Sequence, residues 1–228
     1  LNMSTGDQKY IDEFKDSTNA FEYEGSSISM TMSLFFKGSV KSKSSYNYNG
    51  FVTQLIINYI KHKTGDDYEK LLNKIFADKV KIKYSILPTF SGGSGQGNLH
   101  PNLSASRYDW LRIAKAIMDD YQNDTCVGKY LKEIHKRRIP KNYGGHKKEP
   151  EFNRTKSYGG QFHMDYPGLK DRVVFGMGGY GGQAILIDVE NSRIVVVNSI
   201  HYNNTKYKYN HKKLLIDPIK LGKKSFKK

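Results

Sequence analysis

The spacing of apolar residues changes along this chain of 228 residues, and the change restricts the folds that the chain can adopt. Up to about residue 120, apolar side chains recur every three or four positions, which is the pattern of a helix with one buried face. The predicted helices are Phe51–Ile60, Tyr68–Lys79 and Tyr108–Met118. Further on, β-branched residues gather in short runs that are typical of strands. The predicted strands are Arg172–Gly176, Gln183–Val189 and Arg193–Ile200. Helices that precede antiparallel strands indicate an α+β fold rather than alternating βαβ units.

Cap and turn residues agree with these elements. Gly65 is placed to end the first helix, and either Ser104 or Ser106 can cap the third. The polar segment Glu190–Ser192 is short enough to join the last two strands as a hairpin. We interpret the glycine-rich segment Ser91–Gly97 as a flexible connector, because it lacks the Gly-Lys-Ser/Thr ending of a phosphate-binding loop.

The chain is strongly basic, since 37 Lys and Arg residues against 22 Asp and Glu give a formal net charge of +15. Most of these cations are lysines spread along the whole chain, whereas proteins that read nucleic acids usually rely on arginine as well. We interpret the charge as a solvated lysine-rich surface and expect no nucleic-acid partner. The densest groups, Lys136–Lys148 and Lys206–Lys228, leave a second interpretation open, which is binding to DNA or to an anionic membrane surface.

Cysteine and histidine usage argues against a metal site. Cys126 is the single cysteine, so the chain cannot hold an internal disulfide or a multi-cysteine zinc site. The seven histidines form no H-x-H or H-x-x-x-H pair, and we expect neither a metal nor another cofactor. We interpret Cys126 as a structural residue. No run of about 20 apolar residues is present, so no transmembrane segment is predicted in this chain.

The segment Gly176–Gly181 matches the pattern G-x-G-x-x-G of dinucleotide-binding proteins. In those proteins the glycines open a helix whose N-terminus holds the pyrophosphate. Here the segment leads into the β-branched run that begins near Ala184, so we reject a nucleotide site. A glycine-dense strand end is left, where a ligand can approach the backbone closely because side chains are absent.

A second informative segment is Tyr46–Phe51, which carries Tyr46 and Tyr48 just before a predicted helix. A tyrosine at the end of a loop can shuttle protons if nearby cations lower its pKa from the usual value of about 10. On the residues alone, the plainer interpretation is that both rings only pack against the helix.

Three segments, taken in order, carry a resemblance to a known family. The first is Leu1–Gly6, with the sequence LNMSTG. The second is Tyr48–Gly50 with the helix that ends at Thr64-Gly65, and the third is Met177–Gly179 followed by Tyr180-Gly-Gly-Gln. Between the last two, Leu103–Ser106 and the helix after it are similar to a Ser-Ala-x-Asp-Leu helix. Together these segments resemble the serine β-lactamases and penicillin-binding-protein-like hydrolases, in the branch of class C β-lactamases and related esterases and amide hydrolases.

The resemblance implies acyl transfer, in which a serine attacks a carbonyl and water then relieves the acyl-enzyme. Tyr48 matches the proton-shuttle tyrosine of the family. Met177, Gly178 and Gly179 match the strand that borders the substrate, and the backbone N–H of Tyr180 would stabilise the oxyanion. The substrate implied is a small ester, amide or peptide-like molecule, and the compartment implied is exported or periplasmic.

Two residues depart from the family pattern, and one motif is missing. Gly50 stands where the family has an asparagine that contacts substrate, and Met177 replaces a cationic or histidine residue. Both departures make β-lactam recognition doubtful and favour another ester or amide. The nucleophile motif Ser-x-x-Lys occurs only at Ser225–Lys228, where a chain terminus cannot supply a buried nucleophile. We therefore expect the C-terminal portion of a longer hydrolase, inactive by itself. The alternative is a non-catalytic relative that binds peptide or cell-wall-type ligands.

The expected organisation follows from this resemblance. Residues 1–200 would form a partial β-lactamase-related domain, with a mainly helical lobe over 1–165 and antiparallel strands over 166–200. Residues 201–228 would form a basic C-terminal tail.

Overall fold

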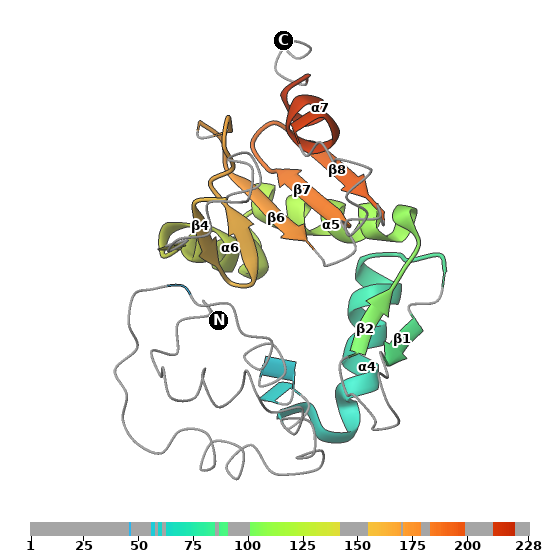
Figure 1. Ribbon diagram of the computed structural model, residues 1–228. Helices are drawn as coiled ribbons and strands as arrows, with labels where there is room; N and C mark the ends of the chain where they lie inside the picture. The colour runs from blue at the N-terminus through green and yellow to red at the C-terminus, as the bar shows by residue number, and fades with distance from the viewer. Residues whose placement is uncertain are drawn as a thin grey trace, which may run out of the picture.

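The computed structural model describes residues 46, 56–57, 59–60, 63–84, 87–90, 101–141, 155–169, 171–178, 183–198 and 212–221. Within these residues, helices accompany a six-stranded antiparallel sheet, so the fold is α+β as predicted (Figure 1). The sheet has the order β3-β4-β5-β6-β7-β8, in which every strand pairs with its neighbour in sequence. Its strands are β3 Ile139–Pro140, β4 Ser157–Gly159, β5 Phe162–Met164, β6 Val174–Gly178, β7 Ala184–Asp188 and β8 Arg193–Val197. A separate pair consists of β1 Leu87–Phe90 and β2 Pro101–Ser104.

The three predicted strands correspond to β6, β7 and β8, and the predicted hairpin turn lies between β7 and β8. Their apolar runs are nearly continuous because both faces of the sheet are covered, and all five residues of β7 are buried. The pattern did not predict β3, β4 or β5, which are two or three residues long and hold few β-branched side chains. Sheet strands therefore begin at Ile139, earlier than the boundary at residue 166 that we expected.

The described helices agree in part with the periodicity, which did not predict the helices at Cys126–Lys136 and at 212–220. The described helices are η2 Gly65–Asp67, α4 Tyr68–Asn73, η3 Lys74–Lys79, α5 Arg107–Gln122, α6 Cys126–Lys136, η5 Lys212–Ile216 and α7 Asp217–Lys220. The predicted helix 68–79 is confirmed as α4 with η3. Gly65 has a positive φ of 51°, a conformation that interrupts the preceding helix as predicted. Ser106 is the N-cap of α5, and its side chain accepts a hydrogen bond from Asp109 N–H.

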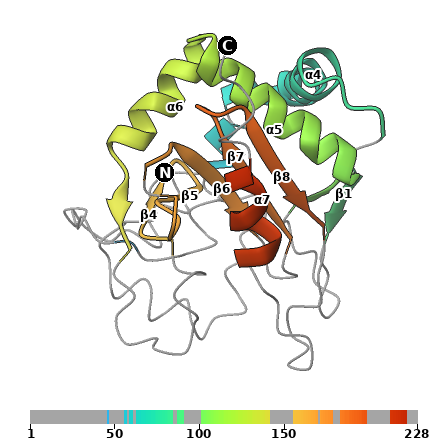
Figure 2. The same ribbon diagram turned by 90° about the horizontal axis from the view of Figure 1, so that it is seen from above.

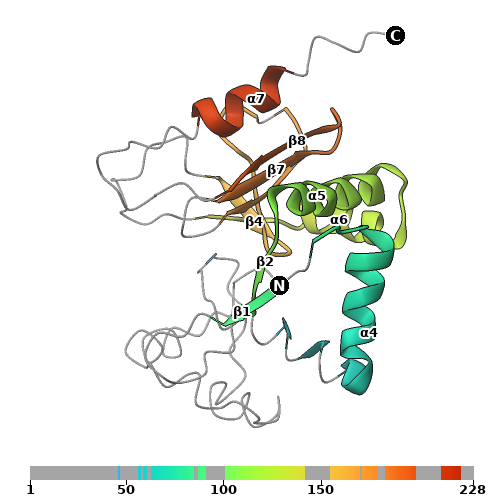
Figure 3. The same ribbon diagram turned by 90° about the vertical axis from the view of Figure 1, so that its right-hand side faces the viewer.

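Two helical layers enclose the sheet. Figure 3 shows α5 and α6 on one face of the strands and α7 on the other. On the first face, Ala114 of α5 and Leu131 of α6 pack against Phe175 of β6. On the second face, Leu215 and Ile219 pack against the sheet in a separate cluster. The helix α4 lies beyond α5, away from the sheet, as Figure 2 also shows.

The C-terminal residues differ from the basic tail that we expected after residue 200. Residues 212–220 are helical, and Leu215, Ile216 and Ile219 are at most 3% exposed. The guanidinium of Arg172 joins this segment to the sheet, since it donates to Asp188 Oδ2 and to the carbonyl of Ile219, both at 3.0 Å. The prediction of a basic tail was wrong because it followed the lysine content of this region. The lysines flank Leu215, Ile216 and Ile219, whose spacing is that of a helix with one buried face.

The structure also corrects our interpretation of Cys126 and of Leu111. Cys126 is exposed and is the first residue of α6, where the side chain of Thr125 caps the helix. Leu111 is 42% exposed, although it is one of the apolar residues of the predicted helix Tyr108–Met118 that we expected to face inward. In the described part of the chain, no helix combines the length and the apolar character needed to cross a membrane.

Candidate functional site

Three of the residues that the resemblance assigned to the site, Tyr48, Gly179 and Tyr180, lie outside the described residues, as does Gly50. The other two, Met177 and Gly178, are the last residues of β6. The strand prediction for this glycine-containing segment is confirmed, because β6 is followed by β7 rather than by a helix. We rejected a nucleotide site because we expected these glycines to lead into a strand and not into a helix.

Met177 and Gly178 face opposite sides of the sheet, since successive residues of a strand alternate. Met177 packs against the apolar cluster that contains Phe175 and helix α5, so its side chain belongs to the core. Gly178 pairs with Ala184 of β7, and a Cβ added at Gly178 would meet only the carbonyl of Gln183, at 3.9 Å. Among the residues that the structure describes, Gln183 is thus the one neighbour within 4 Å of that position, beside the strand end at Gly178.

Gly176, two residues earlier on the same face, has a different environment. A Cβ at Gly176 would lie 1.7 Å from Oη of Tyr166 and 2.5 Å from Cζ of that ring. Tyr166 is itself buried, so its ring fills the space over Gly176. Gly176 therefore accommodates the ring of Tyr166, whereas Gly178 has only Gln183 within 4 Å among the described residues.

A row of paired residues leads across the sheet to this glycine strand. Tyr158 of β4 is opposite His163 of β5, and His163 is opposite Gly176 of β6. Directly paired residues share a face of the sheet. Because neighbouring strands are about 4.8 Å apart and residues rise about 3.3 Å each, the Cα atoms of Tyr158 and Gly178 are separated by roughly 12 Å.

A buried lysine lies at the outer end of this row. Lys141 follows β3, is 7% exposed, and is held by a backbone hydrogen bond of 2.8 Å from its N–H to the carbonyl of Lys156. Its ammonium donates to Thr155 Oγ1 at 2.6 Å and contacts Nδ1 of His163. Because an ammonium only donates, Nδ1 accepts and the ring proton of His163 resides on Nε2.

Two aromatic rings enclose the same ammonium. Nζ of Lys141 lies 5.1 Å from the ring centroid of Tyr46 and 5.5 Å from that of Tyr158. The two ring centroids are 4.9 Å apart, and the Tyr158 ring also meets the His163 ring edge-on at 5.2 Å. The ring faces attract a cation at these distances. We call Lys141, Tyr46, Tyr158, His163 and Thr155 the lysine cluster.

Electrostatics in the lysine cluster disfavour any further positive charge. Burial, together with the positive charge of Lys141, lowers the pKa of His163 to about 3. His163 is therefore a neutral imidazole near neutral pH. Two residues further along the chain, burial alone would raise the pKa of Asp165, but the guanidinium of Arg138 at 2.7 Å and the hydroxyl of Ser157 at 2.5 Å hold that pKa below its usual range.

Sequence reasoning missed the lysine cluster. Lys141 stood within a basic stretch that we interpreted as solvated surface, and no local pattern separates it from its neighbours. Its burial comes from pairing between Lys141 and Lys156 and from rings distant in sequence, which only the fold brings together. We expected the ring of Tyr46 to pack against the helix that follows it, and in the structure it packs against Tyr158 of β4, which Ile56 also contacts.

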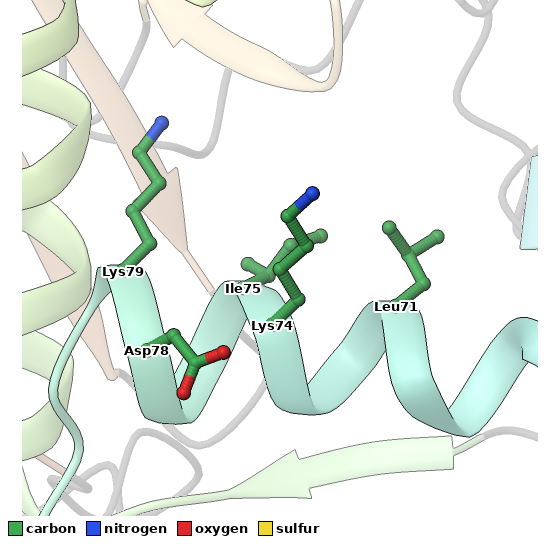
Figure 4. Close-up of a pocket in the computed structure, with 5 residues that line it drawn as sticks. All are labelled: Leu71, Lys74, Ile75, Asp78 and Lys79. Atoms are coloured by element: carbon green, nitrogen blue, oxygen red, sulfur yellow. The ribbon is translucent and has the colours of Figure 1, made fainter.

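A hollow of about 400 Å³ lies elsewhere, on the outer helix α4 with η3 (Figure 4). Its lining residues are Leu71, Lys74, Ile75, Asp78 and Lys79, all from one helix. Lys79 is already paired with Asp120 of α5 at 2.5 Å. Walls from a single helix do not bring polar groups together from several elements, so the hollow lacks the usual form of a ligand site. Among the residues that the structure describes, no three His, Cys, Asp or Glu side chains gather as metal ligands would.

Comparison with family models, with curated proteins and with solved structures gives no match to this chain.

Proposed function

We propose that these residues belong to a serine hydrolase related to the β-lactamases, whose parent protein hydrolyses an ester or an amide through an acyl-enzyme. In this proposal, Tyr48 moves the proton between nucleophile and leaving group. The strand end Met177–Tyr180 borders the substrate and offers a backbone N–H to the oxyanion. The fold proposed is the helical lobe and antiparallel sheet of that family.

The observation that carries the proposal is the attachment of the Tyr46 segment to the sheet that contains β6. Tyr46 packs on Tyr158 of β4, two strands away from β6. Tyr48 follows Tyr46 by two residues, and two residues of chain span at most about 7 Å. The described end of the tyrosine segment, Tyr46, thus packs on the sheet that contains β6, and this packing supports a pocket shared by that segment and the glycine strand.

The glycine at the end of β6 also supports a substrate-bordering strand. A ligand can approach a backbone closely where side chains are absent, and Gly178 carries no side chain.

A second candidate is a non-catalytic protein that binds peptide or cell-wall-type ligands in the same place. The observation that favours it is the packing of Met177, whose side chain belongs to the core with Phe175. A residue in that position does not offer a charge to a substrate carboxylate. Binding through backbone groups of β6 would still be possible without any chemistry.

Covalent labelling separates the two candidates. The longest natural polypeptide that contains these residues is treated with a fluorophosphonate probe or a fluorescent penicillin, and the adduct is located by mass spectrometry. The hydrolase predicts one modified serine in a Ser-x-x-Lys motif, and Tyr48→Phe should slow labelling at least about 100-fold because a proton shuttle contributes that much or more. Tyr84→Phe, at a tyrosine that is 60% exposed, is the matched control and should label at the normal rate. Absence of any adduct, with retained ligand binding, would favour the binding protein.

A further inference from the structure

The outer helix formed by α4 and η3 is amphipathic, yet none of its residues is buried. An isolated helix shorter than about 12–15 residues is marginal in water, and helices in proteins are stabilised mostly by packing of their apolar face. Leu71 is half-buried and Ile75 is 37% exposed, and both border the hollow shown in Figure 4. The face that carries these two residues is therefore left partly open to solvent.

The charge of this helix restricts the partners that fit its open face. Residues 65–79 hold four acidic and three basic residues, so this segment has a net charge of −1 in a chain whose net charge is +15. A helix that lies on an anionic membrane surface is typically rich in Lys and Arg on its polar face. A nearly balanced mixture of charges instead favours a partner that is itself mixed in charge, as a second copy of the same helix is.

Two charged residues beside the apolar contact are self-complementary. Lys74 and Asp78 border the hollow and lie one helical turn apart. A lysine four residues before an acidic residue is the less favourable order for a pair within one helix. The ion pairs in the described part of the chain include neither residue. Both charges are thus available to a second molecule, unlike that of Lys79, which is paired with Asp120.

A two-fold axis brings these charges together with opposite signs. In a symmetric dimer, residue i of one copy contacts residue j of the other, and j contacts i. If the two helices run antiparallel, Lys74 meets Asp78 of the second copy and Asp78 meets Lys74, on either side of an apolar contact that contains Ile75. A parallel arrangement would place like charges opposite each other.

We propose that the chain forms an antiparallel, two-fold symmetric dimer through this face of α4 and η3, with a second copy of the chain as the occupant of the hollow. The inference is independent of the proposed hydrolase, because no residue of the glycine strand takes part. One helix face of this length buries less area than the roughly 1,600 Å² of a standard interface, so we expect a weak dimer with a dissociation constant on the order of 10–100 µM.

Charge reversal tests the pairing, and sedimentation equilibrium at low salt measures the dissociation constant. Lys74→Glu alone and Asp78→Lys alone each create two like-charge contacts per dimer, so each should weaken self-association about 10-fold. The double variant, which exchanges the two charges, should dimerise within about 2-fold of the wild type. A mixture of the two single variants should form heterodimers more tightly than either forms homodimers, because every contact then joins opposite charges.

Ile75→Asp tests the apolar contact and should abolish dimerisation, since it buries an unpaired carboxylate at the interface. Ala77→Asp is the matched control on the same helix. Ala77 is exposed, and residues two positions apart do not share a helix face, so this variant should dimerise as the wild type does. Circular dichroism verifies that each variant retains the helical content of the wild type.

Three results would overturn the proposal. The first is a wild-type chain that stays monomeric at about ten times the expected dissociation constant. The second is a dimer that Ile75→Asp leaves intact, or a double variant that associates no better than the single variants. The third is a monomer that binds phosphatidylserine vesicles through Ile75, because a membrane would then be the occupant of this face.

Discussion

Replacement of Gly176 by alanine tests the packing of the glycine strand at its most crowded point. The new Cβ would lie 1.7 Å from Oη, 2.5 Å from Cζ and 2.7 Å from Cε2 of Tyr166. Rotation of a hydroxyl cannot relieve this overlap, because carbon atoms of the ring are also too close. The ring has little room to move away, since Tyr166 is 9% exposed and packs in the cluster with Leu215 and Ile219.

The expected loss of stability follows from two opposing effects. Overpacking of a well-packed core lowers the free energy of unfolding by about 1–3 kcal/mol, and three overlapping atoms place this substitution at the upper end. Alanine is more favourable than glycine within a strand by roughly 0.5–1 kcal/mol, which offsets part of the loss. We therefore expect Gly176→Ala to lower the free energy of unfolding by about 2 kcal/mol.

Gly178→Ala is the matched control, two residues along the same strand. Its Cβ would meet only one atom, the carbonyl oxygen of Gln183 at 3.9 Å, which is an ordinary contact. Only the preference of a strand for alanine over glycine then applies. The free energy of unfolding should therefore stay constant or rise by up to about 1 kcal/mol. Urea unfolding followed by circular dichroism gives both values.

A double-mutant cycle with Tyr166→Ala identifies the cause. Without the Tyr166 ring only the strand preference is left, so Gly176→Ala should be neutral or slightly stabilising, and the coupling free energy between the two sites should be about 3 kcal/mol. Equal stability of Gly176→Ala and Gly178→Ala, or a Gly176→Ala cost that persists without the ring, would refute the reasoning.

Three further predictions concern the helices and the lysine cluster. Arg172→Met should lower the free energy of unfolding by about 3–5 kcal/mol in urea titrations, because the fully buried carboxylate of Asp188 loses its ion-pair partner. Gly128→Ala should lower it by about 3 kcal/mol despite better helix propensity, since its Cβ would lie 1.9 Å from the backbone oxygen of Asp120. The pKa of His163 is lowered to about 3 in the folded chain, so its contribution is complete above pH 6.5 and is lost as the pH falls toward 3, by up to about 1.4 kcal/mol per pH unit. His163→Gln should flatten the pH dependence of stability in that window.

Each of these predictions has a result that would contradict it. A cost below about 1 kcal/mol for Arg172→Met would mean that Asp188 is hydrated or protonated in the folded protein. A neutral Gly128→Ala would mean that α5 and α6 can separate at little cost. An unchanged pH profile in His163→Gln would show that other groups dominate acid unfolding between pH 3 and pH 6.5.

The periodicity of apolar residues predicted the larger elements of the fold. Helix 68–79, the helix capped by Ser106 and strands β6 to β8 all lie where side-chain spacing and cap residues indicate. These features are local, because the spacing of buried side chains follows from the geometry of one helix or one strand. The short strands β4 and β5 are not predictable in this way, since three residues such as Ser157–Gly159 carry no period.

Local sequence patterns were also insufficient for the C-terminal helix and for the candidate site. The sequence alone showed a lysine-rich C-terminal segment and a glycine-rich strand end, and both descriptions of residue content are correct. Only the tertiary structure decided that Ile219 is buried, that the Tyr166 ring covers Gly176, and that Lys141 is a buried lysine rather than a surface one. The physical reason is that burial depends on atoms contributed by distant parts of the chain. A residue's own neighbours in sequence determine its charge and its local conformation, but not which other side chains exclude water from it.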